Sequence, residues 1–265
     1  MNALDRDQLR SVAPSIFTRS AYHRMTPRYR VAATADVVDL LEGIGLFPVR
    51  AQQSRCRLLD KRDYVKHLIR FRRSEDMDAG VATEVPEVVL TNSFDGTSAY
   101  KLMLGLYRVC CQNGLVCPIG DLGGFSVRHS GGDDFNKRIL DATYSVVAEA
   151  PKALETVQAW KQIALPAPIQ NAYAEAARVL IDSPHVTPAQ LLIPRRPEDE
   201  PNGDGSRSLW QTFNTVEESA LKGGITGTTA TGRKTTTRAV KAVEKDLKLN
   251  KALWVLADQL AQHMA

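Results

Sequence analysis

The sequence has no long apolar run. No stretch of its 265 residues approaches the roughly 20 consecutive apolar residues that a membrane-spanning helix needs. The first ten residues, MNALDRDQLR, include acidic side chains and no apolar run, whereas a secretory signal requires one. We therefore expect a cytoplasmic protein without a membrane partner.

Cysteine is scarce, and its spacing fits no known framework. The four cysteines are Cys56, Cys110, Cys111 and Cys117. They lie too unevenly for a disulfide scaffold, and they do not form with His129 the paired spacing that is typical of a zinc site. We expect no metal and no disulfide. An enzyme that uses Cys110 or Cys111 with His129 is an alternative, although no nucleophile elbow or oxyanion motif accompanies them.

The sequence also lacks the glycine-rich signatures of nucleotide-binding proteins. Neither GxGxxG nor GxxxxGK[ST] occurs, so ATP and NAD are not indicated. The hydrophobic share of 43% and the charged share of 24% are ordinary for a globular protein. We predict a folded protein without a cofactor or catalytic residues, and thus not an enzyme.

Positive charge is unevenly distributed along the chain. Residues 1–73 carry fifteen Lys/Arg against seven Asp/Glu, and residues 222–251 carry eight against two. The whole chain has a net charge of only +4, so the segment between them is acidic. Such an asymmetry indicates a polyanionic partner.

The hydrophobic pattern predicts an α+β fold, in which an antiparallel β-meander packs against helices and the C-terminal region is mostly helical. Asp95-Gly96, between the last two predicted strands, is a strong hairpin signal. The predicted strands are 47–59, 64–73, 86–94 and 98–109. The predicted helices are 34–45, a long region from Asp133 or Asp134 to Lys161 that Pro151 kinks or splits, 168–182, a short one after Thr187, 208–222 and a last one to His263.

Composition predicts the domain organisation. Residues 194–207 hold three prolines and two glycines, which is typical of a linker or exposed loop. We expect an α+β core domain at 1–193 and a helical region at 208–265. Within the latter, residues 224–238 (GITGTTATGRKTTTR) are poor in large apolar side chains, so we expect a flexible basic loop.

The first predicted hairpin places basic side chains on one face. A turn at Lys61-Arg62 sets Arg57 opposite Lys66, and Arg55 opposite Leu68. One face then carries Ile69 and Phe71 with His67 as a core histidine. The other face collects Arg55, Arg57, Lys66, Arg70 and Arg72.

A basic face of this kind is suited to a phosphate backbone, and exposed Tyr64 and Tyr100 would stack on unpaired bases. We therefore expect a nucleic-acid-binding protein, with single-stranded DNA favoured. Alternatives are a solvated face, cover by the acidic loop 74–84, or a protein-interaction module that counters host defence. The predicted binding residues are Arg55, Arg57, Tyr64, Lys66, Arg70, Arg72, Arg128, His129, Arg233, Lys234 and Arg238.

Five segments resemble a known family. They are NSFDGTSA at 92–99, YRVCCQNGL at 107–115, SVRH at 126–129, WQTFNTVEE at 210–218 and LNKALW at 249–254. Together they resemble the phage/plasmid-like family of the domain of unknown function 932, which is found in prophages and conjugative elements. The resemblance would cover nearly the whole chain, and it implies no activity and no catalytic residues.

A second likeness concerns only the order of elements and the charge. A helix, a β-meander with an Asp-Gly turn and a long helix are similar to the core of the Rad52-like single-strand annealing proteins. This analogy implies DNA annealing in recombination and a homo-oligomer. The sequence has no counterpart of that group's closing helical motif, which argues against both.

Overall fold

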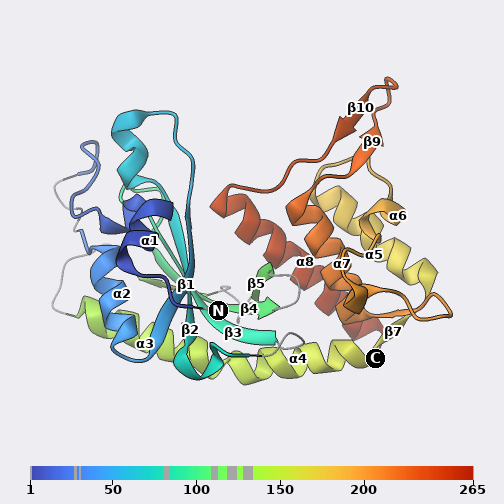
Figure 1. Cartoon of the computed structure of the whole chain (residues 1–265), viewed down its shortest axis with the longest axis horizontal. Helices are drawn as coiled ribbons and strands as arrows, with labels where there is room; N and C mark the ends of the chain where they lie inside the picture. The colour runs from blue at the N-terminus through green and yellow to red at the C-terminus, as the bar shows by residue number, and fades with distance from the viewer. Residues whose placement is uncertain are drawn as a thin grey trace. The chain divides into compact units, whose positions relative to one another are not determined.

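The computed structural model describes residues 2–26, 29, 31–79, 84–108, 113–117, 124–127 and 134–264. It divides into two compact units, Met1–Ala150 and Pro151–Ala265 (Figure 1). The segment 194–207, which the sequence suggested as a linker between domains, lies within the second unit.

An antiparallel sheet forms the centre of the first unit, as predicted. Its five main strands follow one another in chain order, and a short sixth strand pairs with β4. Gly96, in the turn between β3 and β4, has a φ of 77°, which glycine adopts without strain. The strands are β1 (Leu46–Gln53), β2 (His67–Arg73), β3 (Glu84–Asn92), β4 (Tyr100–Arg108), β5 (Asn113–Cys117) and β6 (Phe125–Val127).

Helices cover one face of this sheet. Helix α2 contacts β1, helix α3 contacts β3, β4 and β6, and the two helices contact each other, so they share a face (Figure 1). Buried Ile69, Phe71, Leu90 and Leu104 form the core beneath them. The helical elements are α1 (Arg6–Val12), η1 (Pro14–Phe17), α2 (Thr34–Glu42), η2 (Leu59–Tyr64), η3 (Ser74–Asp76) and α3 (Phe135–Ala148).

A buried polar cluster joins α2 to the sheet. The ring of His67 forms hydrogen bonds with the hydroxyls of Ser15 and Thr34, both at 2.9 Å, so the prediction of a core histidine is confirmed. Thr34 also lies 3.0 Å from the hydroxyl of Tyr100, which donates to the carbonyl of Ala32. Tyr100 is fully buried, and the prediction that it is exposed for base stacking is wrong.

The second unit is mostly helical, as predicted. Aromatic side chains from three helices form its core: Trp160 lies 4.5 Å from Trp254 and 5.7 Å from Phe213 between ring centroids. Its elements are α4 (Ala150–Gln162), β7 (Ala164–Leu165), α5 (Ala167–Leu180), α6 (Pro188–Leu191), η4 (Pro197–Asp199), β8 (Arg207–Ser208), α7 (Leu209–Lys222), β9 (Thr226–Thr228), β10 (Lys234–Thr236) and α8 (Val243–Met264).

The predicted ends of several helices are confirmed. The long helical region is divided into α3 and α4 next to Pro151, whose ring is compatible with the first turn of a helix. Thr187 and Ser208 cap α6 and α7 through capping boxes. Among the described residues, none of the helices combines the length and hydrophobicity required to cross a lipid bilayer.

Candidate nucleic-acid interface

The connection between β1 and β2 differs from the predicted hairpin. Strand β1 ends at Gln53, which pairs with His67, and Gln52 rather than Arg55 lies opposite Leu68. Residues 54–66 leave the sheet and include the 3₁₀ helix η2. The predicted pairing of Arg57 with Lys66 is therefore wrong.

Contacts with the N-terminal segment explain this departure. The hydroxyl of Tyr22 donates to Asp60 at 3.0 Å, and the hydroxyl of Thr18 donates to the carbonyl of Asp63. These long-range bonds hold the polar run 60–63 out of the strand ladder. A period-2 pattern in residues 54–59 cannot show such bonds, because they depend on residues forty positions earlier.

Two of the predicted binding residues are buried. Arg70 and Arg72 lie on the sheet face opposite α2, as the alternation of β2 requires, but their side chains are only 4% and 2% exposed. Glu87 of β3 accepts from Arg72 at 2.7 Å and from Arg70 at 3.3 Å. The guanidinium of Arg72 also lies 4.5 Å from the ring centroid of Tyr107. The prediction that both arginines face an external polyanion is wrong, because both are buried and ion-paired with one carboxylate of the same chain.

The sequence contains a signal for this cluster. Glu87 is the one acidic residue between Val85 and Asn92, a segment otherwise rich in Val, Leu and Thr. A charged residue within a buried strand is normally paired. Its partner could not be identified without knowing that β3 lies beside β2.

Other cations of residues 54–66, which we call the basic loop, are accessible. Arg55, Arg57 and Arg62 are exposed, and none of them forms an ion pair with a residue that the structure describes. Lys66 is half-buried. Tyr64 is also half-buried: its hydroxyl lies 3.3 Å from that of Ser20 and its ring 5.4 Å from that of Tyr22.

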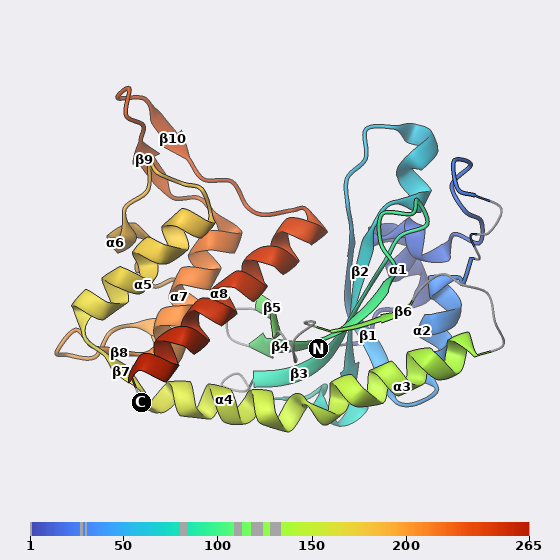
Figure 2. The ribbon, with the colours of Figure 1, turned by 180° about the vertical axis from the view of Figure 1, so that it is seen from behind.

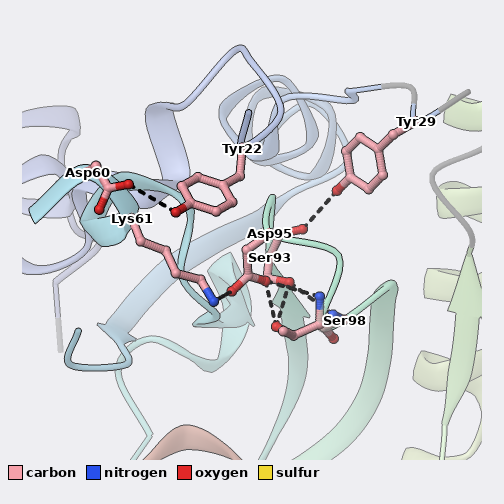
Figure 3. A network of polar contacts seen from close by, with 8 residues as sticks. Tyr22, Tyr29, Asp60, Lys61, Ser93, Asp95 and Ser98 are labelled. Carbon is pink, nitrogen blue, oxygen red and sulfur yellow. Dashed lines mark hydrogen bonds and ion pairs between the residues drawn. The ribbon is translucent and has the colours of Figure 1, made fainter. Parts of the chain in front are cut away.

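A polar network fixes the basic loop to the turn between β3 and β4 (Figure 3). The ammonium of Lys61 lies 2.9 Å from Oδ2 of Asp95, whose side chain is 5% exposed. The other carboxylate oxygen of Asp95 accepts from the backbone and the hydroxyl of Thr97. Tyr29 donates to the carbonyl of Ser93 on the same turn. Three segments of the chain therefore meet at this end of the sheet.

The electrostatics of the network favour a structural role. Burial alone would raise the pKa of Asp95, but hydrogen bonds from Thr97 and Lys61 outweigh it and hold this pKa below its usual value. The hydrogen bond to Asp95 in turn raises the pKa of Lys61. Lys61 is protonated near neutral pH and so is not a nucleophile, and the depressed pKa makes the Asp95 carboxylate a poor general base. The network positions the loop.

The second basic segment, residues 224–238, is not the irregular loop that its composition suggested. Strands β9 and β10 pair antiparallel, with Thr226 opposite Thr236 and Thr228 opposite Lys234. We call residues 224–238 the ribbon. Its predicted binding residues Arg233, Lys234 and Arg238 are all exposed, and none of the three is in an ion pair within the described ranges.

Acidic residues are absent around the ribbon in sequence. From Lys222 to Val243 the chain has five Lys/Arg and no Asp or Glu. The nearest buried carboxylate, that of Glu218, is already bonded to Lys222 at 2.5 Å and Arg196 at 3.2 Å. The ribbon therefore presents uncompensated positive charge.

The remaining candidates cannot be placed in the site. Arg128 and His129 lie outside the described residues, as do Cys110 and Cys111 of the alternative enzyme site. Cys56 is half-buried and forms no disulfide.

Comparison with known proteins identifies the family. Two Escherichia coli (strain K12) proteins, UPF0380 protein YfjQ and UPF0380 protein YafZ, are each 38% identical over 260 residues, which cover 97% of this chain and 91% of theirs. No solved structure matches, and these relatives give no support to the Rad52-like analogy. The pattern of the domain of unknown function (DUF932) matches residues 21–254. This span includes the network of the β3–β4 turn and the whole ribbon, and the chain belongs to the DUF932 family.

Proposed function

We propose that this protein binds nucleic acid through the basic loop and the ribbon. The observation that carries the proposal is the segment 222–243, which has five cations and no carboxylate; four of its basic side chains (Arg233, Lys234, Arg238 and Lys241) are exposed and form no ion pair with a described residue. Basic residues without acidic neighbours repel one another, and binding to a polyanion relieves this repulsion. The polyanion releases its condensed counterions when the basic residues take their place.

The contact set is smaller than the sequence suggested. Arg70 and Arg72 are excluded by their ion pairs with Glu87. The residues that would contact phosphates are Arg55, Arg57, Lys66, Arg233, Lys234 and Arg238, with Arg128 and His129 as further candidates. Tyr64 would stack on a base of the bound nucleic acid. Of the two predicted stacking groups, Tyr64 and Tyr100, only Tyr64 has an accessible side chain.

Salt dependence tests this proposal. If the six named cations all contact phosphates, log K should fall with log[salt] with a slope of about −4 to −5. Binding of labelled single-stranded and double-stranded DNA would be measured by fluorescence anisotropy. Arg57→Glu and Arg238→Glu should each weaken binding and flatten the slope.

The absence of binding to either form of DNA at low salt would refute the proposal. Size-exclusion chromatography of the same samples would show whether the protein is a homo-oligomer.

A protein-interaction module is the second candidate, and one observation favours it. A groove of about 530 Å³ lies between the end of α5 and α8, and it is lined by Leu180, Leu249 and Ala252 together with Lys245 and the ion pair of Lys248 with Glu244. Aliphatic walls with charged edges of both signs fit an amphipathic protein segment that carries leucines. Loss of partner binding in a Leu180→Glu variant, with DNA binding unchanged, would support this second candidate over the first.

A further inference from the structure

The two faces of the ribbon differ sharply. On one face Thr226, Thr228, Lys234 and Thr236 are all exposed, and the hydroxyls of Thr226 and Thr236 lie 2.9 Å apart. The other face carries Gly227 opposite Thr235, both half-buried. The outward face thus consists only of hydroxyl groups and a cation, with Arg233 next to it at the turn.

The base of the ribbon is fixed to the α5–α6 connection and to helix α6 of its own unit. A β-carbon at Gly227 would overlap the carbonyl of His185, so the backbone approaches this segment more closely than any other residue would permit. Gln190 donates to the carbonyl of Thr226 at 2.8 Å. The chain therefore fixes the direction of the ribbon, which projects away from helices α5 to α8 (Figure 2).

The turn is also ordered. The amide of Thr229 donates to the carbonyl of Arg233 at 2.9 Å, and the amide of Arg233 donates back to the hydroxyl of Thr229 at 3.1 Å. These bonds fix the position of the Arg233 backbone at the end of the ribbon. Little backbone entropy would therefore be lost at the turn when Arg233 and Lys234 meet a ligand.

The dimensions of the ribbon match one feature of double-stranded DNA. Beyond the Gly227–Thr235 pair, residues 228–234 extend by roughly 10 Å, at about 3.3 Å per strand residue. The major groove of B-DNA is about 12 Å wide and 8.5 Å deep, and it admits a two-stranded β-ribbon. Its base edges offer acceptors to arginine, lysine and threonine side chains.

We infer that the ribbon enters the major groove of double-stranded DNA, with Arg233 and Lys234 at the base edges or the flanking phosphates and the threonine hydroxyls along the groove wall. This inference rests on the proposed function and names its substrate class. Arg238, the last residue of the ribbon, and Lys241, just beyond it, are both exposed; they lie where the chain leaves the groove and meet the phosphate backbone.

Single strands and RNA duplexes fit the ribbon less well. Single-stranded binding relies on aromatic platforms, but residues 224–238 contain no aromatic residue and Tyr100 is buried. The major groove of an RNA duplex is too deep and narrow for side chains to read. The ribbon therefore favours duplex DNA over both, which revises the expectation of single-stranded DNA.

Affinity measurements on three ligands test this inference. A duplex DNA, its single strand and the RNA duplex of the same sequence would be titrated at one low salt concentration. We expect the DNA duplex to bind at least tenfold more tightly than either competitor. Arg233→Glu with Lys234→Glu should abolish this preference, whereas Lys152→Glu with Lys251→Glu, which changes the same charge on exposed helical positions, should leave it intact.

A second variant keeps the charge and moves the ribbon. Gly227→Ala should displace it from His185 and reduce the duplex preference, while Gly203→Ala, where a β-carbon meets open space, should not. Methylation of guanine N7 in the duplex should interfere with binding of the wild type. Circular dichroism spectra would confirm that each variant is folded.

The outcomes separate the two proposals. If neither DNA form binds, the proposed function fails and this inference fails with it. If DNA binds but the duplex is not preferred, or N7 methylation has no effect, or the ribbon variants behave like their controls, the inference alone is overturned.

Discussion

Strand β2 and the ribbon carry similar pairs of basic residues, but the pair in β2 is buried and ion-paired, whereas the pair in the ribbon is exposed. The side chains of Arg70 and Arg72 are buried, and Glu87 bonds to both. Arg233 and Lys234 point into solvent, in a segment without an acidic residue. The basic pair in β2 therefore takes part in stabilising the fold, whereas the basic pair in the ribbon is available to a ligand. The difference is made by a neighbouring strand and not by the basic residues themselves.

Replacing Glu87 tests whether its carboxylate holds Arg70 and Arg72 in place, and it has the largest expected effect. Glu87→Gln would remove the carboxylate that bonds to both buried guanidinium groups, and breaking a buried ion pair in this way typically costs about 3–5 kcal/mol. We expect a loss of this size in the free energy of unfolding, measured by urea denaturation.

The exposed Glu155→Gln on α4 provides the matched control, for which a change within about 0.5 kcal/mol is expected. A loss below about 1 kcal/mol for Glu87→Gln would mean that Arg70 and Arg72 are not held by this carboxylate. Both arginines would then return to the set of candidate ligand contacts.

The pair of Lys61 and Asp95 lies between these extremes, because it is partly buried and holds the basic loop in place. The pKa of Asp95 is depressed in the folded protein, so the carboxylate stabilises the fold above its unfolded pKa of about 3.9, and this contribution is lost as the pH falls through the lower, folded value. Lys61 has a raised pKa, so its contribution is present below about pH 10.4 and is lost at higher pH.

Asp95→Asn should therefore lower the free energy of unfolding by about 1–2 kcal/mol at pH 7. It should also remove part of the decrease in stability below pH 4, which pH-dependent urea titrations would measure. An unchanged acid limb of the stability curve would show that the ion pair does not anchor the loop. Asp141→Asn, at an exposed position of α3 outside the network, is the control, and it should change the free energy of unfolding by less than about 0.5 kcal/mol.

Much of the fold could be predicted from local patterns. Alternating apolar residues such as Leu102, Leu104 and Leu106 identify β4, Asp95-Gly96 identifies its hairpin, and the caps at Thr187 and Ser208 identify helix starts. These features depend on residues that are close together in sequence, so a single chain is sufficient to recognise them.

The candidate site could be predicted only in part, since its key features depend on distant residues. Alternation along β2 correctly separates Arg70 from Ile69, but it cannot show that Arg70 is buried or that Glu87 lies on the next strand. The ribbon was missed for a different reason. Its poverty in large apolar residues suggested a loop, whereas the β-branched side chains of its threonines favour extended strands.

A substitution of Arg57 tests whether an exposed basic residue contacts the ligand, and it has the smallest expected effect on stability. Arg57 is exposed in the basic loop, so Arg57→Ala should change the free energy of unfolding by less than about 0.5 kcal/mol. If it contacts a phosphate, the same substitution should reduce the salt slope of DNA binding by about one. Arg19→Ala removes an equal charge from an exposed arginine that Asp36 already neutralises at 2.7 Å, and it should leave the slope unchanged. Equal effects of the two substitutions would mean that only net charge matters, and the basic loop would lose its claim to a specific phosphate contact.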